Sequence, residues 1–377
     1  MNLRHKLIGV LVAAFALGAS AVAQIPDLLT GLDAGGRAMG MGGSLYGTSA
    51  DSFSALSNPA GLGYVSGRQV TLAFRNLPES ATTAQNNFRN PDLSTDAGSG
   101  DIGLTHAGLV QRQGKGAIGL SYTKLGHIND SRVGLGDLTL DAGTSIRNYR
   151  EKQRASIDMF TLAYGQAANA TGYTYGFGLV FASTYVRNTQ SYDLVSGGNA
   201  NPTTPLDISG SGNGVGVVAG MQYVPKNSKM VYGVSVRTPI DLQGNAGTSQ
   251  ILDRIPGRLE LSVAKRQENY RGEGNYLLYG ASAGRTFGSN YGQLFQRKGQ
   301  FFGGLGVEFN RVMGNARIPL RVGYQVIPNA GRGFKDRNSL TFGVGYRPFD
   351  QNYSVDLNFA TSSGSFDRGI AITYRLK

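Results

Sequence analysis

Fourteen stretches in which apolar residues alternate with small or polar ones constrain this chain more than any other feature. The clearest stretch runs from Tyr173 to Phe181, where Tyr175, Phe177 and Leu179 alternate with small or β-branched residues. A period of two predicts strands that have one apolar face. A soluble sandwich shows the same alternation, so periodicity alone does not decide between a sandwich and a membrane barrel.

The lengths of the connections between these stretches decide the matter. Long connections follow the odd-numbered stretches, at 77–102, 126–150, 187–210, 238–256 and 286–299. Short connections follow the even-numbered stretches, at 111–116, 166–172, 224–229, 311–315 and 347–352. Short turns on one side and long loops on the other are typical of outer-membrane barrels. We therefore predict an all-β fold: a transmembrane antiparallel β-barrel of about 14 strands, with both ends on the periplasmic, short-turn side.

The first residues have the features of a secretory signal peptide. Arg4 and Lys6 precede an apolar run, and Ala21-Val22-Ala23 forms a small-residue cleavage site. Cleavage before Gln24 leaves 377 − 23 = 354 residues with a net charge of 34 − 24 = +10. An exported barrel belongs in the bacterial cell outer membrane, where lipid and lipopolysaccharide surround it. The predicted divisions are a signal peptide at 1–23, an N-terminal hatch segment at 24–66 and the barrel at 67–377.

The stretch from Gly35 to Leu62 does not follow the alternation. Six glycines between Gly35 and Gly47 disfavour an ordinary strand or helix interior, because glycine permits positive φ and close backbone approach. Asp51 can cap a short helical turn through Leu56, which we expect to end before an Asn-Pro pair. We predict a compact segment of small residues that fits inside the barrel.

This stretch resembles the N-terminal hatch of the FadL/TodX family of outer-membrane transporters for long-chain fatty acids and other hydrophobic compounds. The resemblance rests on Arg37-Ala-Met-Gly-Met-Gly-Gly43, on Asp51, and on Asn58-Pro59-Ala60-Gly61-Leu62. PorV-like proteins of the type 9 secretion apparatus carry a similar opening. Two departures are a single acidic residue, Asp51, where family members often have a pair, and a C-terminus that does not end in an aromatic residue.

The sequence offers two sets of candidate site residues, one from the hatch motif and one from the strand faces. The first set would gate or bind ligand in the hatch, and we expect its asparagine amide to bridge hatch backbone and barrel wall; a plain Asn-Pro turn is the alternative. Its members are Gly40, Gly42, Gly43, Asn58, Pro59 and Gly61. The second set consists of charges opposite the apolar strand faces, which either pair with one another or, at an arginine, hold a ligand carboxylate. Its members are Arg75, Glu260, Glu308, Arg321 and Asp356.

Several functional classes find no support in the sequence. Cysteine is absent, and outside the signal peptide the only histidines are His106 and His127, so we expect no metal and no cofactor. His106 with Ser121 is the one pair that an outer-membrane lipase could use, and a hydrogen-bonded strand histidine is the simpler interpretation. We expect no enzyme. Basic residues are scattered without a stripe, which argues against nucleic acid.

Two functions remain. The first is a channel for small hydrophobic compounds such as long-chain fatty acids, which enter through extracellular loops and pass when the hatch shifts. The second is a PorV-like component that binds secretion-system proteins without transport. Long polar connections such as 187–210 are compatible with either function.

Overall fold

A computed structural model describes residues 36–87, 92–141, 144–168, 172–196, 198–244, 253–288, 298–328, 336–349, 352–362 and 365–376. The predicted signal peptide and Gly35 lie outside the described residues. Among the described residues, no helix is long and apolar enough to cross a membrane.

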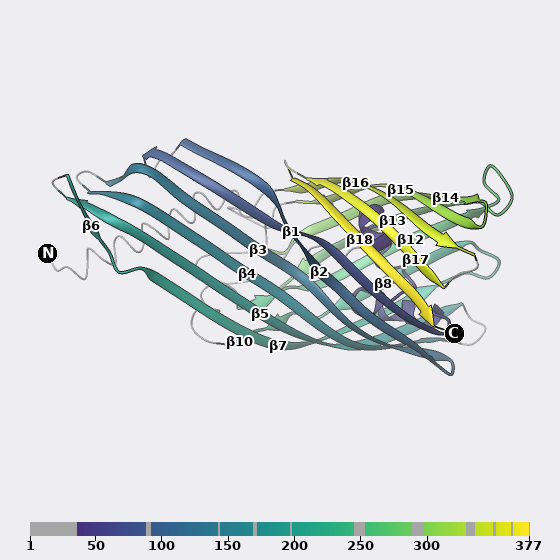
Figure 1. Cartoon of the computed structure of the whole chain (residues 1–377). Coiled ribbons are helices and arrows are strands. Elements are labelled where there is room, and N and C mark those ends of the chain that lie inside the picture. Colours follow the sequence, from purple (N-terminus) through teal and green to yellow (C-terminus); the bar gives the residue numbers. More distant parts are fainter. Residues whose placement is uncertain are drawn as a thin grey trace.

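Fourteen antiparallel strands close into a barrel (Figure 1). Each strand pairs with its neighbours in sequence, and the ring closes where the last strand, β18, pairs with β1 from Arg68↔Leu376 to Arg75↔Gly369. The predicted fold is therefore confirmed. The strands are β1 Arg68–Asn87, β2 Asp92–Gln113, β3 Gly116–Asp141, β4 Thr144–Ala167, β5 Tyr173–Ser196, β7 Leu206–Tyr223, β8 Met230–Arg237, β12 Gly257–Glu268, β13 Tyr276–Phe287, β14 Phe301–Met313, β15 Ala316–Ile327, β16 Arg337–Pro348, β17 Tyr353–Ser362 and β18 Ser365–Leu376.

The two halves of the barrel wall differ in height. Strands β1 to β5 and β7 contain 18 to 26 residues, whereas β8 and β12 to β18 contain 8 to 13. Most of the expected long loops at 77–102, 126–150 and 187–210 are therefore wrong, because the strands continue through them. The alternation fades there since, outside the bilayer, water and not lipid meets the outer face of a strand, so that face does not have to be apolar.

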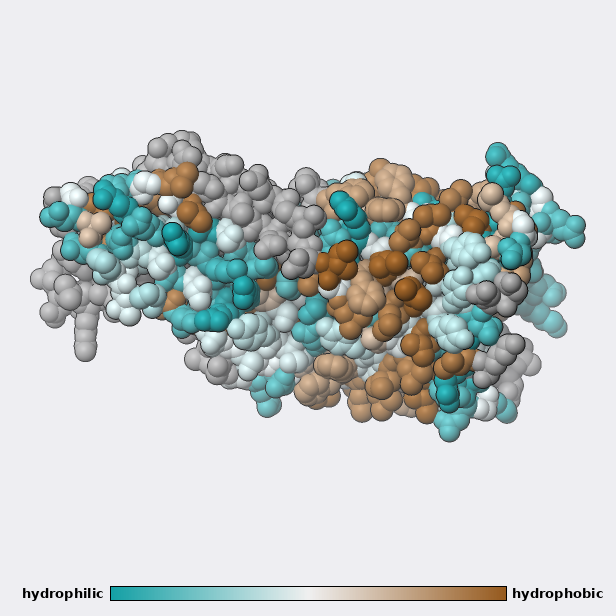
Figure 2. Space-filling view, viewed as in Figure 1, coloured by the Kyte–Doolittle hydropathy of each residue, from teal (hydrophilic) through white to brown (hydrophobic). Residues whose placement is uncertain are grey.

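The outward face carries an apolar band at the level of the short strands. Phe177 is 59% exposed, and Leu120, Leu162, Leu305 and Leu320 project from the same surface. Figure 2 shows this band over the short-turn half of the barrel, while the tall part of the wall is mostly hydrophilic. On β5 the outward face becomes charged at Arg187, whose guanidinium binds the carboxylate of Asp207 on β7 at 2.7 Å. This ion pair marks the end of the lipid-facing band on that strand.

The hairpin of β1 and β2 changes partners partway up the wall. The pairing of β2 with β3 ends at His106↔Thr123, and the β1–β18 pairing ends at Arg75↔Gly369. Beyond a register shift between Asn76 and Pro78, β1 stays paired with β2 and also runs parallel to β3. Proline has no N–H to donate to a ladder, which gives a reason for the shift.

Four short strands belong to two connections that we expected to be loops. Strand β6, Asn199–Pro202, pairs with the end of β5. Between β8 and β12, strands β9 Ile240–Asp241 and β11 Arg254–Ile255 form a sheet of their own, and β10 Gln243–Gly244 pairs with β7. Ile240 and Ile255 are fully buried, so part of the 238–256 connection folds against the wall instead of extending into solvent.

Charge on the outward face should be costly only within the apolar band. We expect Phe177→Arg to reduce folding into lipid vesicles, by about 2–4 kcal/mol if it lies near the bilayer midplane. Thr189→Arg, on the same face of β5 but beyond Arg187, should cost about 0–1 kcal/mol. Electrophoresis of unboiled samples after refolding into vesicles measures both variants. Equal losses for the two would contradict the assigned band.

Gly178, on the opposite face of β5, is not a suitable control for that experiment. The sequence predicts that Gly178→Ser is mild, but a Cβ at this position would lie 2.8 Å from the Ala163 Cβ and 2.9 Å from the Leu162 carbonyl oxygen. Because one of these atoms belongs to backbone, the clash cannot be relieved by turning a side chain, and that expectation is wrong.

Candidate functional site

Residues 36–65 lie inside the barrel at its short-turn end, where Figure 1 shows their short helices enclosed by the strands. The segment consists of α2 Gly36–Gly40, a run of turns, α3 Ser54–Ser57 and the 3-10 helix η2 Pro59–Tyr64. We call residues 36–65 the inner segment. One side packs Met41 and Leu45 against β12 and β13, and the other packs Ala55 and Leu62 against β2, β3 and β4.

The helical expectations for this segment need two corrections. Despite its glycines, Gly36–Gly40 forms one helical turn. The second helix begins at Ser54 and not at Asp51, because the Asp51 carboxylate accepts the N–H of Phe53 at 3.0 Å and closes a turn ahead of the helix.

Asn58 joins the inner segment to the barrel wall. Its Nδ2 donates to the Gly47 carbonyl at 2.7 Å, and to the carbonyls of Met221 on β7 and Val234 on β8 at 3.3 Å each. Its Oδ1 accepts the N–H of Ala60 at 3.2 Å, and Asn58 itself is fully buried. Pro59 holds Asn58 in an extended conformation, with φ −156° and ψ 95°. The amide thus makes the contacts that a bridge between segment and wall requires.

The four candidate glycines all lie where a side chain has no room. Gly42 and Gly43 have φ of +62° and +75°, and a Cβ on Gly42 would lie 2.7 to 2.8 Å from backbone atoms of Tyr324. A Cβ on Gly40 would collide with Asn358 Oδ1, and one on Gly61 would collide with the carbonyl oxygen of Ser49.

Glycines also occupy the barrel wall where it touches the inner segment. A Cβ on any of them would meet backbone or short side chains of the inner segment, so its absence allows the two backbones to approach closely. These wall glycines come from seven strands: Gly165, Gly176, Gly220, Gly233, Gly280, Gly304, Gly306 and Gly323. Sequence reasoning did not single them out, although each falls on the inward face of an alternating strand.

Polar side chains of the wall satisfy carbonyls of the inner segment. Gln222 Nε2 donates to the carbonyls of Gly47 and Ser49 at 3.0 and 3.1 Å. Ser282, Thr341 and Arg112 donate in the same way to Gly43, Gly40 and Gly63, at 3.2, 3.2 and 2.7 Å. A buried backbone carbonyl needs such a partner, so the polar inward face serves the inner segment directly.

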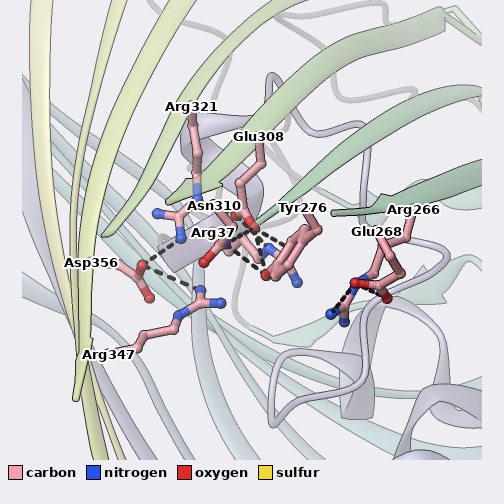
Figure 3. A network of polar contacts seen from close by, with 9 residues as sticks. All are labelled: Arg37, Arg266, Glu268, Tyr276, Glu308, Asn310, Arg321, Arg347 and Asp356. Carbon is pink, nitrogen blue, oxygen red and sulfur yellow. Dashed lines mark hydrogen bonds and ion pairs between the residues drawn. The ribbon is translucent and has the colours of Figure 1, made fainter. Parts of the chain in front are cut away.

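Three of the five predicted lumen charges meet in one network (Figure 3). Arg321 is fully buried, and its guanidinium binds Glu308 on β14 and Asp356 on β17 at 2.7 Å each. Arg37 of the inner segment binds the same Glu308 carboxylate at 2.7 and 2.8 Å. Tyr276 and Asn310 add hydrogen bonds to Glu308 Oε1 at 3.2 and 2.7 Å. The network ties α2 to the wall.

The other two predicted charges are paired elsewhere. Arg75 binds Asp367 at 2.6 Å, and Glu260 binds Arg258 at 2.8 Å. All five charges therefore have a protein partner of opposite sign, and this arrangement favours mutual pairing over a ligand carboxylate at Arg75 or Arg321.

His106 does not pair with Ser121, and the simpler interpretation, a hydrogen-bonded strand histidine, is confirmed. Its Nε2 lies 3.0 Å from Ser52 Oγ of the inner segment, its Nδ1 lies 3.0 Å from Thr123 Oγ1, and its ring stacks on Phe53. In the register of β2 and β3, His106 lies opposite Thr123, two residues beyond Ser121, and the Ser121 hydroxyl has no hydrogen-bond partner among the described residues. Among the described residues, no group of three or more acidic or histidine side chains could hold a metal ion.

An apolar region lies in the lumen on the outer side of the inner segment. Ile157, Met159, Val180, Ala182 and Val218 project inward from β4, β5 and β7, and Ile240 and Ile255 fill the space between them. Leu56 of the inner segment packs against the same cluster. The lumen is therefore apolar immediately beyond the inner segment.

Arg237 is the functional candidate that sequence reasoning missed. It lies at the end of β8 beside the apolar cluster, where its guanidinium contacts Met159 Sδ at 3.6 Å and the Pro256 carbonyl at 3.3 Å. Its Nε has no hydrogen-bond partner, and no described carboxylate lies within ion-pair distance of it. The alternation does place Arg237 in the lumen: Val236 lies on the outward face of β8, so the next residue, Arg237, faces inward.

Comparison with known proteins finds relatives among solved structures only; no family model and no curated protein matches the sequence. A Pseudomonas aeruginosa FadL homologue shares 14% identity, with a TM-score of 0.62 over 94% of this chain and 99% of the homologue. The Ralstonia pickettii toluene transporter TbuX shares 15% identity, with a TM-score of 0.60 over 93% of this chain and 99% of TbuX. The CymD monoaromatic hydrocarbon channel shares 13%, with a TM-score of 0.56 over 92% and 98%.

This chain has the FadL/TodX-type barrel fold. The similarity covers almost the whole length of both chains, so it includes the 14-stranded barrel of an outer-membrane protein. The resemblance drawn from about 28 residues of sequence is confirmed at the level of the fold. No observation on the described residues favours the PorV-like alternative.

Removal of the Asn58 side chain should loosen the inner segment of this FadL/TodX-type barrel. Asn58→Ala removes the hydrogen bonds to Met221 and Val234 of the wall, at a cost of about 1–3 kcal/mol, while the Gly47 carbonyl keeps Gln222 as a donor. We expect brief openings in planar-bilayer conductance that wild type lacks. Ser57→Ala is the matched control, because Ser57 Oγ donates only to the Phe53 carbonyl within the segment. If both variants conduct like wild type, the amide does not hold the segment in place.

Proposed function

We propose that this protein takes up hydrophobic compounds across the outer membrane, that residues 24–66 act as its hatch, and that its preferred compounds carry an acidic head group, as long-chain fatty acids do. Solved proteins with this fold include a toluene transporter and a monoaromatic hydrocarbon channel, which supports a hydrophobic compound. The acidic head group is suggested by one observation, the partly buried guanidinium of Arg237 beside an apolar lumenal cluster, with an inaccessible Nε that has no hydrogen-bond partner.

The chemistry of that position suits an amphiphile. An alkyl chain would replace Ile240 and Ile255 among Met159, Val180 and Val218, and would gain the burial that these isoleucines give up. A carboxylate at the chain end would supply the ionic partner that Arg237 lacks among the described residues. A guanidinium in a water-poor site binds a carboxylate through charge-assisted hydrogen bonds.

Two closures then lie in series along the lumen. The outer closure is the small sheet of β9 and β11, which fills the apolar region with its two isoleucines. The inner closure is the hatch, tied to the wall by Asn58, by Arg37 and by close backbone contacts. A ligand displaces the first by competing for the same apolar surface, and passes the second when the hatch shifts.

The head-group preference can be tested by comparing a fatty acid with its methyl ester. We expect wild type to bind the acid more tightly than the ester. Arg237→Met, which keeps an unbranched apolar stem, should remove about tenfold or more of that preference, as expected for a lost charge-assisted hydrogen bond. Ester binding should change little, and this internal control separates head-group recognition from misfolding. Equal loss for both ligands would contradict the role of Arg237.

The hatch can be tested by its removal. Wild type should be closed or nearly closed in planar bilayers, and deletion of residues 24–65 should open a stable pore, because the inner segment fills the short-turn end of the lumen. The deletion variant must first show the heat-dependent electrophoretic shift of a folded barrel. A folded variant that conducts no better than wild type would mean that this segment is not the gate.

A further inference from the structure

A cavity lies at the short-turn mouth of the barrel, on the opposite side of the hatch from the apolar cluster. Its volume is about 470 Å³, and five of its lining residues are arginines. Four of them face inward from the ends of barrel strands and the fifth belongs to the hatch; they are Arg266, Arg317, Arg347, Arg375 and Arg37. Figure 3 shows Arg37, Arg266 and Arg347, each beside a carboxylate that it binds.

Positive charge exceeds negative charge around this cavity. Arg37 and Arg347 share their carboxylates, Glu308 and Asp356, with the buried Arg321, and the Arg347–Asp356 contact is long at 3.6 Å. Arg266 binds Glu268 at 2.7 Å. The six guanidinium groups thus have three carboxylates between them.

Two of these arginines supply the excess. Neither Arg317 nor Arg375 has an ion-pair partner among the described residues, which end at Phe349 and resume at Asn352 in this part of the chain. The buried Nε of Arg317 has no hydrogen-bond acceptor, although its guanidinium lies 5.3 Å from the Phe349 ring centroid.

We propose that this mouth is a binding site for a phosphate group. Guanidinium groups bind tetrahedral oxyanions through paired N–H donors, and several that converge on one cavity favour a ligand with more than one negative charge. The apolar part of the lining is small, with Pro348 and Phe349 at its edge. An alkyl chain would find little surface there, so the ligand is a compact anion and not the transported lipophile.

Arg37 links this site to the hatch, and this link rests on the proposed gating function. A phosphate held between Arg37 and the wall arginines ties the hatch to the wall and reduces the repulsion among like charges. Because a displaced hatch removes Arg37 from the cavity, the anion binds the seated state more tightly. Phosphate must then stabilise the closed hatch by the same free energy by which hatch seating strengthens phosphate binding.

The test measures inorganic phosphate binding to the full chain in detergent, by calorimetry at constant ionic strength. We expect saturable binding by wild type that Arg317→Gln and Arg375→Gln each weaken about tenfold, as for a lost charged hydrogen bond. Arg311→Gln is the matched control, since Arg311 lies on the same mouth but on the outward, exposed face of β14. Each variant is first checked for the heat-dependent shift of a folded barrel.

The outcomes answer three separate questions: whether the site binds phosphate, whether the natural phosphate belongs to a lipid, and whether binding is coupled to the hatch. Absence of binding, or equal loss in Arg311→Gln, overturns the site. If short-chain phosphatidic acid binds more tightly than inorganic phosphate, the natural source is a lipid head group; equal binding identifies free phosphate. Phosphate should also slow proteolysis within the hatch of wild type but not of Arg375→Gln. Binding without this protection overturns the coupling while the site stands.

Discussion

The close approach of two backbones is the interaction on which the rest of this structure depends. The hatch lies against strands whose inward positions at the contact are glycines, and Gly42 of the hatch meets Gly304 and Gly323 of the wall with no Cβ on either side. A side chain at these positions would push the hatch away from the wall and leave its carbonyls without the donors that Gln222 and Thr341 now supply. The glycines at this contact thus have a structural role beyond turn formation.

Besides the glycine contacts, buried ion pairs hold the hatch in position. Glu308 accepts hydrogen bonds from Arg37, Arg321, Tyr276 and Asn310 while it is fully excluded from solvent. Removal of one partner from a buried ion pair leaves an uncompensated charge and is strongly destabilising, whereas the intact pair adds little net stability. Such a network therefore fixes the position of α2 more than it stabilises the barrel.

The sequence predicted the barrel well because one physical rule governs it: lipid on one face requires alternation, and Phe177 and its neighbours obey that rule. The tall part of the wall was missed, since an outer face of 126–150 that meets water does not have to be apolar and leaves no such pattern. For the site, Asn58 and the hatch glycines were found through a motif, and Glu308 and Arg321 through the inward face. Their partners were not, because pairing of Arg37 with Glu308 depends on contacts separated by 271 residues. Arg237 was missed because nothing in the sequence shows that it lacks a carboxylate.

The distribution of these contacts favours a small local shift of the hatch over its departure from the lumen. Departure would separate Arg37 from Glu308 and Asn58 from two strands, and would expose glycine-lined backbone on both surfaces at once. The contacts are not uniform, however. The half of the hatch near Leu62 packs in an apolar cluster with Val110 and Ala163, while the half near Arg37 borders the arginine-lined cavity. An ion pair can exchange its charged partner for a ligand, whereas apolar packing has no such partner. For the gating proposed above, we therefore expect the Arg37 half to move and the Leu62 half to act as its anchor.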